Sequence, residues 1–145
     1  MRTTILTATA AAVLAAANLM AGGFWLQLGN PEANAEARQA HAVLTIQAAG
    51  CHDPASAKVT ATAVGVVHGE RRTIPLNLTP LARPGFYALA QQWPKEGKWV
   101  LHLEAHSDSA VTSTLVTAGP EGIDRLHAKS EMRAFAGGDV DAMLR

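Results

Sequence analysis

The chain has 145 residues and a mass of 15.2 kDa, which is the size of one domain. Its 12 basic residues balance its 12 acidic residues, and this zero net charge argues against a nucleic-acid-binding protein, which usually carries a basic face. Hydrophobic residues make up 48% of the chain, which excludes a disordered protein.

The start of the chain predicts an export signal. Arg2 is followed by an uncharged, mostly apolar run over residues 5–28. A short positive start before an apolar stretch is typical of a secretory signal peptide. The tripeptide Ala33-Asn34-Ala35 places small residues at the two positions that signal peptidase recognises. Residues 1–35 are therefore the predicted leader, and cleavage is predicted directly after them.

The alternative is a retained N-terminal membrane anchor. A helix needs about 20 apolar residues to span a bilayer, and the run over residues 5–28 reaches that length. Phe24-Trp25 would then lie at the membrane surface as an aromatic anchor. In this alternative, residues 5–28 are the only part of the chain in contact with the membrane. Both interpretations export the rest of the chain to the periplasm or the outside, with residues 36–40 as a linker.

Beyond the leader, the pattern predicts short β-strands separated by turns. Alternating apolar and polar positions and many β-branched residues are typical of half-buried strands. The predicted strands cover residues 42–48, 58–67, 72–78, 86–93, 98–106 and 110–117. No long stretch shows helical periodicity. The sequence therefore predicts an all-β fold, a small antiparallel immunoglobulin-like sandwich over residues 41–118.

Turn residues predict how these strands connect. His68-Gly69-Glu70 predicts a turn, and Pro75 places the following strand at a sheet edge or bulge, because proline lacks an N–H. The Pro-Lys-Glu-Gly segment over residues 94–97 predicts a hairpin loop. The tail over residues 119–145 is predicted to be irregular, partly mobile and on the sandwich surface. A short helical turn capped by Asp139 is expected near its end.

The most distinctive segment spans residues 84–103. Alternation directs Trp99 towards the core between the sheets, and the Tyr87 hydroxyl is expected to tie down a strand edge. The segment has a Pro-Gly-x-Tyr strand, a Pro-x-x-Gly hairpin and an aromatic-led strand that ends in Leu. This pattern resembles exported immunoglobulin-like sandwich domains of the YtkA-like and FixH-like type. The resemblance covers residues 41–117 and implies the sandwich fold and export; such domains often accompany metal-handling or respiratory proteins.

A candidate metal site lies on the strand that begins with Trp99. His102, Glu104 and His106 fall on the face opposite the Trp99 side chain. Residues two apart on a strand lie on the same side, about 6–7 Å apart. Zinc and copper accept two imidazoles and a carboxylate as ligands. The competing interpretation is a solvated sheet face with no cofactor, because alternating polar side chains are normal there.

Two further groups of possible ligands accompany this candidate site. Glu104-x-His106 is similar to the Asp-x-His pair of CopC-type copper-binding sandwiches, with Glu in place of Asp. Those sandwiches also use an N-terminal histidine, so His41 would have to become the first residue of the mature chain. Cys51-His52-Asp53 is either a ligand-rich loop or a polar turn. The lone Cys51 is interpreted as a buried thiol, with an intermolecular bridge or a reactive thiol as alternatives.

Motifs of the common enzyme classes are absent from the sequence. The chain has no Gly-x-Ser-x-Gly or His-Glu-x-x-His sequence, phosphate-binding loop or dinucleotide fingerprint. We therefore expect a non-enzymatic, exported accessory or binding module of the cell envelope, whose partner is another envelope protein bound through an edge strand or loops. A periplasmic copper or zinc binding module is the alternative, and a hydrolase without a recognisable motif is a third class.

Overall fold

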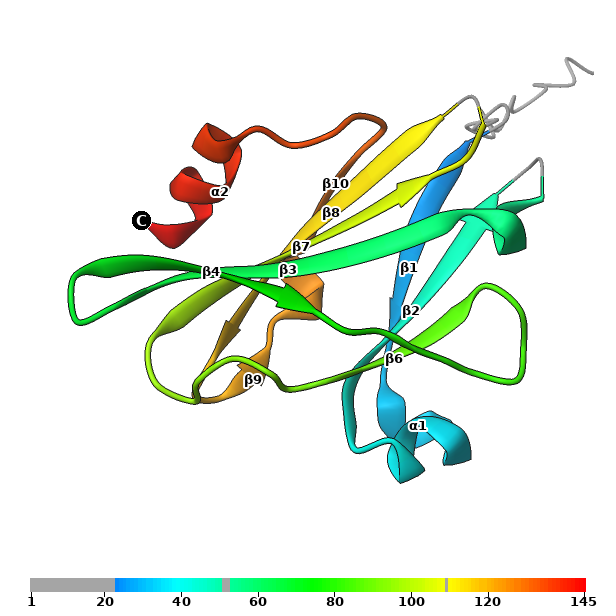
Figure 1. Cartoon of the computed structure of the whole chain (residues 1–145), viewed down its shortest axis with the longest axis horizontal. Helices are drawn as coiled ribbons and strands as arrows, with labels where there is room; N and C mark the ends of the chain where they lie inside the picture. Colours follow the sequence, from blue (N-terminus) through cyan, green and yellow to red (C-terminus); the bar gives the residue numbers. More distant parts are fainter. Residues whose placement is uncertain (1–22, 51–52, 109) are drawn as a thin grey trace, which may run out of the picture.

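The computed structural model describes residues 23–50, 53–108 and 110–145, which form two antiparallel sheets packed face to face (Figure 1). The first sheet has four strands in the order β1-β2-β6-β5. The second sheet has six strands, in the order β10-β8-β7-β3-β4 with β9 paired to β8. The predicted antiparallel β-sandwich is therefore confirmed.

The strand bounds divide between the two sheets. The four-stranded sheet contains β1 (Phe24–Gly29), β2 (Ala42–Gly50), β5 (Thr79–Pro80) and β6 (Phe86–Ala90). The six-stranded sheet contains β3 (Lys58–Val67), β4 (Glu70–Leu76), β7 (Lys98–His106), β8 (Val111–Gly119), β9 (Gly122–Ile123) and β10 (Lys129–Glu131). The helices are α1 (Ala35–Gln39) and α2 (Gly137–Leu144), with short 3₁₀ turns η1 (Pro31–Ala33), η2 (Pro54–Ser56) and η3 (Arg125–His127).

Strand β1 belongs to the sandwich although it lies within the predicted leader. It pairs antiparallel with β2, and its alternate residues Phe24 and Leu26 are buried in the core between the sheets. The sandwich therefore starts at Phe24, upstream of the predicted start at residue 41. The predicted cleavage after residue 35 would remove β1. Residues 1–22, which carry the rest of the predicted leader or anchor, lie outside the described residues.

The core lies between the sheets and is centred on β7. Trp99, Leu101 and Leu103 have no exposed surface, as the two-residue period of a strand predicts. The indole N–H of Trp99 donates to the backbone carbonyl of Glu96 at 2.9 Å, so its one polar group is satisfied inside the protein. Gly65 on β3 pairs with Trp99 on β7, and a Cβ at Gly65 would come within 2.5 Å of the indole. The tryptophan therefore fits only because this residue is glycine.

The segment between β6 and β7 crosses between the sheets, so the predicted hairpin at residues 94–97 is wrong. Strand β6 pairs with β2 and β5, whereas β7 pairs with β3 and β8. Trp93 and Trp99 flank this crossover and are 7% and 0% exposed. Passing from one layer to the other lets both indoles face the shared core, and a short Pro-Gly segment suits a crossover as well as a hairpin.

The predicted turn at His68-Gly69-Glu70 is confirmed as the link between β3 and β4. His68 and Gly69 have φ angles of 51° and 80°, the left-handed backbone of a tight two-residue hairpin turn. Strand β4 forms one edge of the six-stranded sheet, so the edge position predicted from Pro75 is also confirmed.

The C-terminal tail is more regular than predicted. Strands β9 and β10 pair with β8, so the sheet extends past the predicted end of the sandwich at residue 118. Helix α2 packs on the outer face of this sheet, where Phe135 and Val140 meet Val64, Val100 and Leu115. The Asp139 carboxylate accepts the backbone N–H of Ala136 at 2.9 Å and so supports the first turn of α2, which starts two residues before Asp139.

Across the parts of the chain that the structure describes, no helix is both long and apolar enough to cross a membrane.

Candidate functional site

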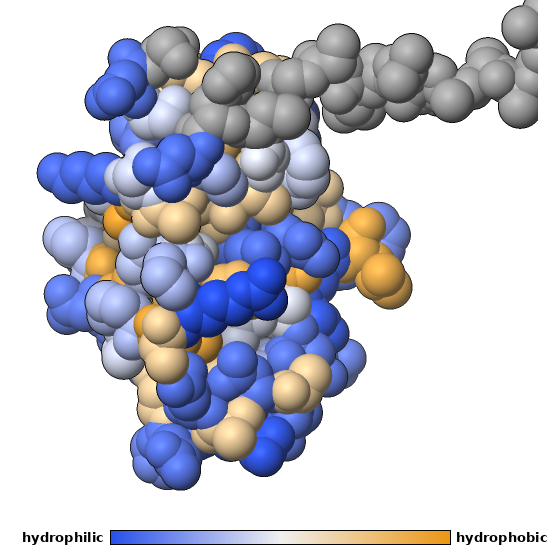
Figure 2. Space-filling model, turned by 90° about the vertical axis from the view of Figure 1, so that its right-hand side faces the viewer, coloured by the Kyte–Doolittle hydropathy of each residue, from blue (hydrophilic) through white to orange (hydrophobic). Residues whose placement is uncertain are grey.

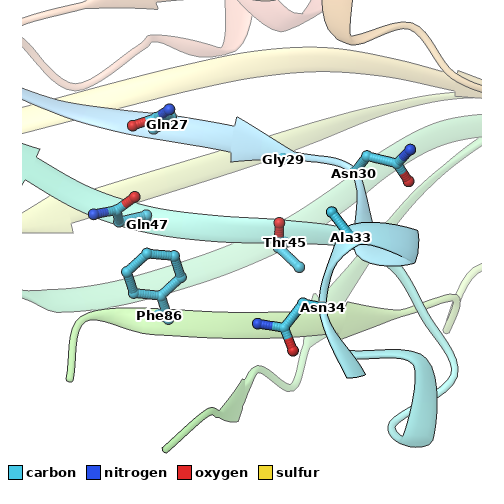
Figure 3. Close-up of a pocket in the computed structure, with 8 residues that line it drawn as sticks. All are labelled: Gln27, Gly29, Asn30, Ala33, Asn34, Thr45, Gln47 and Phe86. Atoms are coloured by element: carbon cyan, nitrogen blue, oxygen red, sulfur yellow. The ribbon is translucent and has the colours of Figure 1, made fainter. Parts of the chain in front are cut away.

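A polar pocket lies on the outer face of the four-stranded sheet, where β1 leads into η1 (Figure 3). Its volume is about 260 Å³. Eight residues from three strands and the β1–α1 connection line it: Gln27, Gly29, Asn30, Ala33, Asn34, Thr45, Gln47 and Phe86.

Strand register brings the sheet residues of this pocket together. Gln27 on β1 pairs with Gln47 on β2, and Gln47 pairs with Phe86 on β6, so the three side chains form a row across three strands. Their neighbours along each strand, such as Leu26 and Ile46, point into the core. The row therefore faces outward because the alternate positions are occupied by core residues.

Two asparagines between β1 and β2 form the other wall of the pocket. Asn30 caps η1 by accepting the backbone N–H of Glu32 at 3.0 Å, and Asn34 caps α1 by accepting that of Ala37 at 3.0 Å. Each bond uses the side-chain oxygen and leaves the NH₂ group available. Figure 3 shows the amide nitrogen of Asn34 directed towards the middle of the pocket.

Gly29 and Thr45 form the floor of the pocket. They are paired across β1 and β2, and a Cβ at Gly29 would overlap the Thr45 hydroxyl. Within the described ranges, the side chains of Gln27, Thr45 and Gln47 make no hydrogen bond. Their donors and acceptors are therefore free to contact a ligand.

The pocket is electrically neutral. Of the described residues that line it, none has a titratable side chain. The guanidinium of Arg83 lies over the Phe86 ring, 4.7 Å from its centroid, but Arg83 does not line the pocket. Such a surface offers hydrogen bonds and one aromatic ring but no group that transfers a proton at neutral pH.

The predicted metal ligands form a contact cluster on β7. Glu104 lies between the two histidines: His106 Nε2 contacts its Oε1, and His102 Nε2 lies 3.4 Å from its Oε2. The hydroxyl of Ser113 donates to the same Oε2 at 3.3 Å. The His102 ring meets Phe135 edge-on, with centroids 6.2 Å apart. The structure thus brings together all three residues that the strand alternation predicts.

The contacts of this cluster differ from those of a metal centre. The two ring nitrogens lie against different oxygens of the Glu104 carboxylate, so they do not point to one shared position that an ion could occupy. His102 Nε2 is buried and, despite its distance from Glu104, has no hydrogen bond of acceptable geometry. Among residues 23–50, 53–108 and 110–145, no group of three His, Cys, Asp or Glu side chains could hold a metal ion as arranged.

None of the other predicted ligands is seen to join this cluster in the described part of the chain. His41 directly precedes β2, a strand of nine residues and roughly 30 Å. The chain leaves the other end of β2, passes through η2 and enters β3 at Lys58, which pairs with His106. His106 therefore lies near the end of β2 that is opposite to His41. Figure 1 accordingly shows α1, which ends just before His41, far from the β7–β8 turn that follows His106. Cys51 and His52 lie outside the described residues.

The Phe24-Trp25 pair divides between the core and the surface. Phe24 is 5% exposed and part of the core, so this residue is not available as the predicted membrane-surface anchor. Trp25 is 44% exposed and lines an apolar groove of about 170 Å³ with Met132, next to Gly23. On the face seen in Figure 2, hydrophobic residues are scattered among hydrophilic ones.

The sequence pattern did not predict the pocket residues, because five of the eight fall within the predicted leader. A local signal for them exists: Phe24, Leu26 and Leu28 alternate with Trp25 and Gln27, which is the pattern of a half-buried strand. The absence of charge in this stretch concealed the signal, because a leader and a core strand share that property.

Comparisons with models of known protein families, with curated proteins and with solved structures found no match for this chain.

Proposed function

We propose that this protein is an exported, non-enzymatic binding module of the cell envelope, built on an immunoglobulin-like sandwich of the YtkA-like and FixH-like type. The neutral pocket is the observation that carries the proposal. Five of its eight lining residues, Gln27, Asn30, Asn34, Thr45 and Gln47, have polar uncharged side chains. Such groups bind and orient a ligand, whereas acid–base catalysis needs a titratable group near the operating pH.

Export is supported by the sequence that precedes β1. Because β1 is part of the core, the leader has to end before Phe24 if the sandwich is to keep this strand. Ala21 and Gly23 are small residues at the two positions that signal peptidase recognises for a cut before Phe24. We therefore place the end of the leader at Gly23 instead of Ala35. In the alternative with a retained anchor, the domain starts directly at the membrane surface.

The pocket face suits a partner better than the exposed edge of the six-stranded sheet. An edge strand can accept another chain through its unpaired backbone groups. Strand β4, at that edge, carries Glu70, Arg71, Arg72 and Pro75. Charged residues and proline protect an edge against such pairing. Of these two surfaces, the pocket is therefore the one at which we expect an envelope component to bind.

The test uses the chain that begins at Phe24, labelled with ¹⁵N, and three envelope fractions: phospholipid vesicles, cell-wall glycan and soluble envelope protein. We expect one fraction to shift the side-chain amide signals of Gln27 and Gln47 without being consumed. Absence of any shift with all three fractions would contradict the binding function. Conversion of a fraction to new products would contradict the non-enzymatic function.

Metal binding by His102, Glu104 and His106 is a second candidate function, because β7 places these three possible ligands side by side on one face of the sheet. An ion would have to replace the contacts of both imidazoles with Glu104, because the histidines now face the carboxylate. Calorimetric titration with copper and zinc tests this candidate. Binding weaker than micromolar would contradict metal binding. Binding that is lost in the His102→Ala/His106→Ala variant but kept in His127→Ala would support it.

A further inference from the structure

We propose that the pocket on the four-stranded sheet binds one neutral sugar residue of an envelope glycan. This inference rests on the proposed binding function and names the chemical class of the ligand. It is carried by three features of the pocket: uncharged polar groups without partners, an aromatic ring beside them, and a volume suited to a single ring.

The free polar groups match the chemistry of sugar hydroxyls. Each glutamine amide offers N–H donors and a carbonyl acceptor, and the Thr45 hydroxyl offers both functions. A sugar hydroxyl also donates and accepts, so amides satisfy it without any charge. Gln27, Thr45 and Gln47 lie on adjacent strands, and their side chains have no hydrogen-bond partner in the described parts of the chain. A phosphate or carboxylate ligand would need a basic residue, and none of the described lining residues is basic.

Phe86 supplies an apolar surface next to these groups. A sugar ring has C–H groups on its faces and hydroxyls around its rim, so it can contact an aromatic ring and amides together. Phe86 is half-buried, pairs with Gln47 and lies beside it in Figure 3. The Arg83 guanidinium lies over the same ring in cation–π contact, and Arg83 does not itself line the pocket.

The size of the pocket favours one sugar residue. Its 260 Å³ corresponds to roughly eight or nine water molecules at about 30 Å³ each, and it lies just below the usual range for drug-sized ligands. Neighbouring residues of a glycan would therefore extend over the sheet surface.

The pocket walls are held in position before a ligand arrives. The side chains of Asn30 and Asn34 are oriented by their caps on η1 and α1, and strand pairing fixes the backbone from which the two glutamines extend. Such preorganisation lowers the entropic cost of binding. A peptide cannot add to β2 at the pocket, because β2 is already paired with β1 on one side and β6 on the other.

The experiment titrates the ¹⁵N-labelled chain that begins at Phe24 with N-acetylglucosamine, its β-1,4-linked tetramer, and maltose. We expect shifts of the Gln27, Gln47 and Asn34 side-chain amides. The Gln27→Ala/Gln47→Ala variant should weaken the affinity by about tenfold or more, since it removes two ligand hydrogen bonds. Gln39→Ala, an exposed glutamine on α1 outside the pocket, is the matched control and should bind as the unchanged chain does.

Backbone spectra of each variant establish that it is folded. No shift with any neutral sugar, together with shifts caused by a soluble envelope protein, would overturn the sugar proposal but leave the binding function intact. Glucuronic acid is titrated as the charged comparison, and tighter binding of it than of the neutral sugars would overturn the neutral ligand class. The absence of any shift with the sugars and with every envelope fraction would overturn both proposals.

Discussion

At the residue scale, the contact between Trp99 and Gly65 shows how one position is constrained by its neighbour across the sheet. The indole occupies the space that a side chain on Gly65 would need, and it lies at the centre of the core. Interiors are packed too densely to absorb an added methyl group without shifting their neighbours.

Gly65→Ala is therefore expected to lower the free energy of unfolding by about 1–3 kcal/mol, the usual cost of overpacking. Urea denaturation followed by tryptophan fluorescence measures the change. Gly119→Ala is the matched control, because no atom lies within 4 Å of a Cβ placed there. Equal denaturation midpoints for the two variants would contradict the packing explanation.

Asp139 provides a pH-dependent contact at the start of α2. Hydrogen bonding to Arg133 is the main cause that lowers the pKa of this carboxyl below its ordinary value of 3.8, and the backbone N–H of Ala136 adds to it. A carboxyl whose pKa is lowered by folding stabilises the folded state above its ordinary pKa. That stabilisation is lost as the pH falls through the lowered value.

We expect the first turn of α2 to loosen on acidification below the ordinary pKa of Asp139. Amide hydrogen exchange in α2, compared at neutral and acidic pH, measures this loosening. Asp139→Asn should exchange faster than the unchanged chain at neutral pH and respond less to acid. An Asp139 carboxyl that titrates at its ordinary pKa in an NMR experiment would show that the Arg133 contact has no effect.

At the scale of single elements, α2 depends on its contact with the six-stranded sheet. It spans eight residues, and isolated helices shorter than about 12–15 residues are marginal in water. Val140 is its buried residue, 4% exposed, and Phe135, two residues before the helix begins, is 7% exposed and packs in the same cluster. The packing of these side chains, rather than intrinsic helix propensity, therefore holds α2 in place.

Val140→Ala removes two buried methyl-sized groups from this contact. At about 0.8 kcal/mol for each, we expect a loss of about 1–2 kcal/mol and faster hydrogen exchange that is confined to α2. Ala142→Ser, at an exposed position of the same helix, is the control. Equal exchange rates for α2 in the two variants would show that the helix is held by other contacts.

At the scale of the whole molecule, β1 closes one side of the sandwich. It forms an edge of the four-stranded sheet, packs near β8 of the other sheet, and contributes half of the glutamine pair in the pocket. The domain and its candidate site therefore depend on a strand that the predicted leader would have contained.

A chain that begins at Glu36 is expected to lose cooperative unfolding or to aggregate, because it lacks the buried Phe24 and Leu26. A chain that begins at Phe24 should unfold in one cooperative transition. Thermal denaturation followed by circular dichroism compares the two chains. N-terminal sequencing of the exported protein is the companion measurement, and a mature terminus at Glu36 would contradict the proposed end of the leader.

Local patterns were enough to predict several strands and their faces. The bounds predicted for β3 and β7 match the structure, because alternation and β-branching are carried within each strand. The same alternation places Trp99 in the core and His102, Glu104 and His106 on the opposite face. Pro75 marks an edge strand because a missing N–H is a property of the residue itself.

Features that depend on distant partners were outside the reach of these patterns. An uncharged stretch can be a leader or a core strand, and only its pairing with β2 identifies β1. The segment before β7 has the turn residues of a hairpin, yet the need to bury Trp93 and Trp99 between layers makes it a crossover. The pocket arises from the register of three strands, so side chains far apart in the chain become neighbours only when the sheet forms.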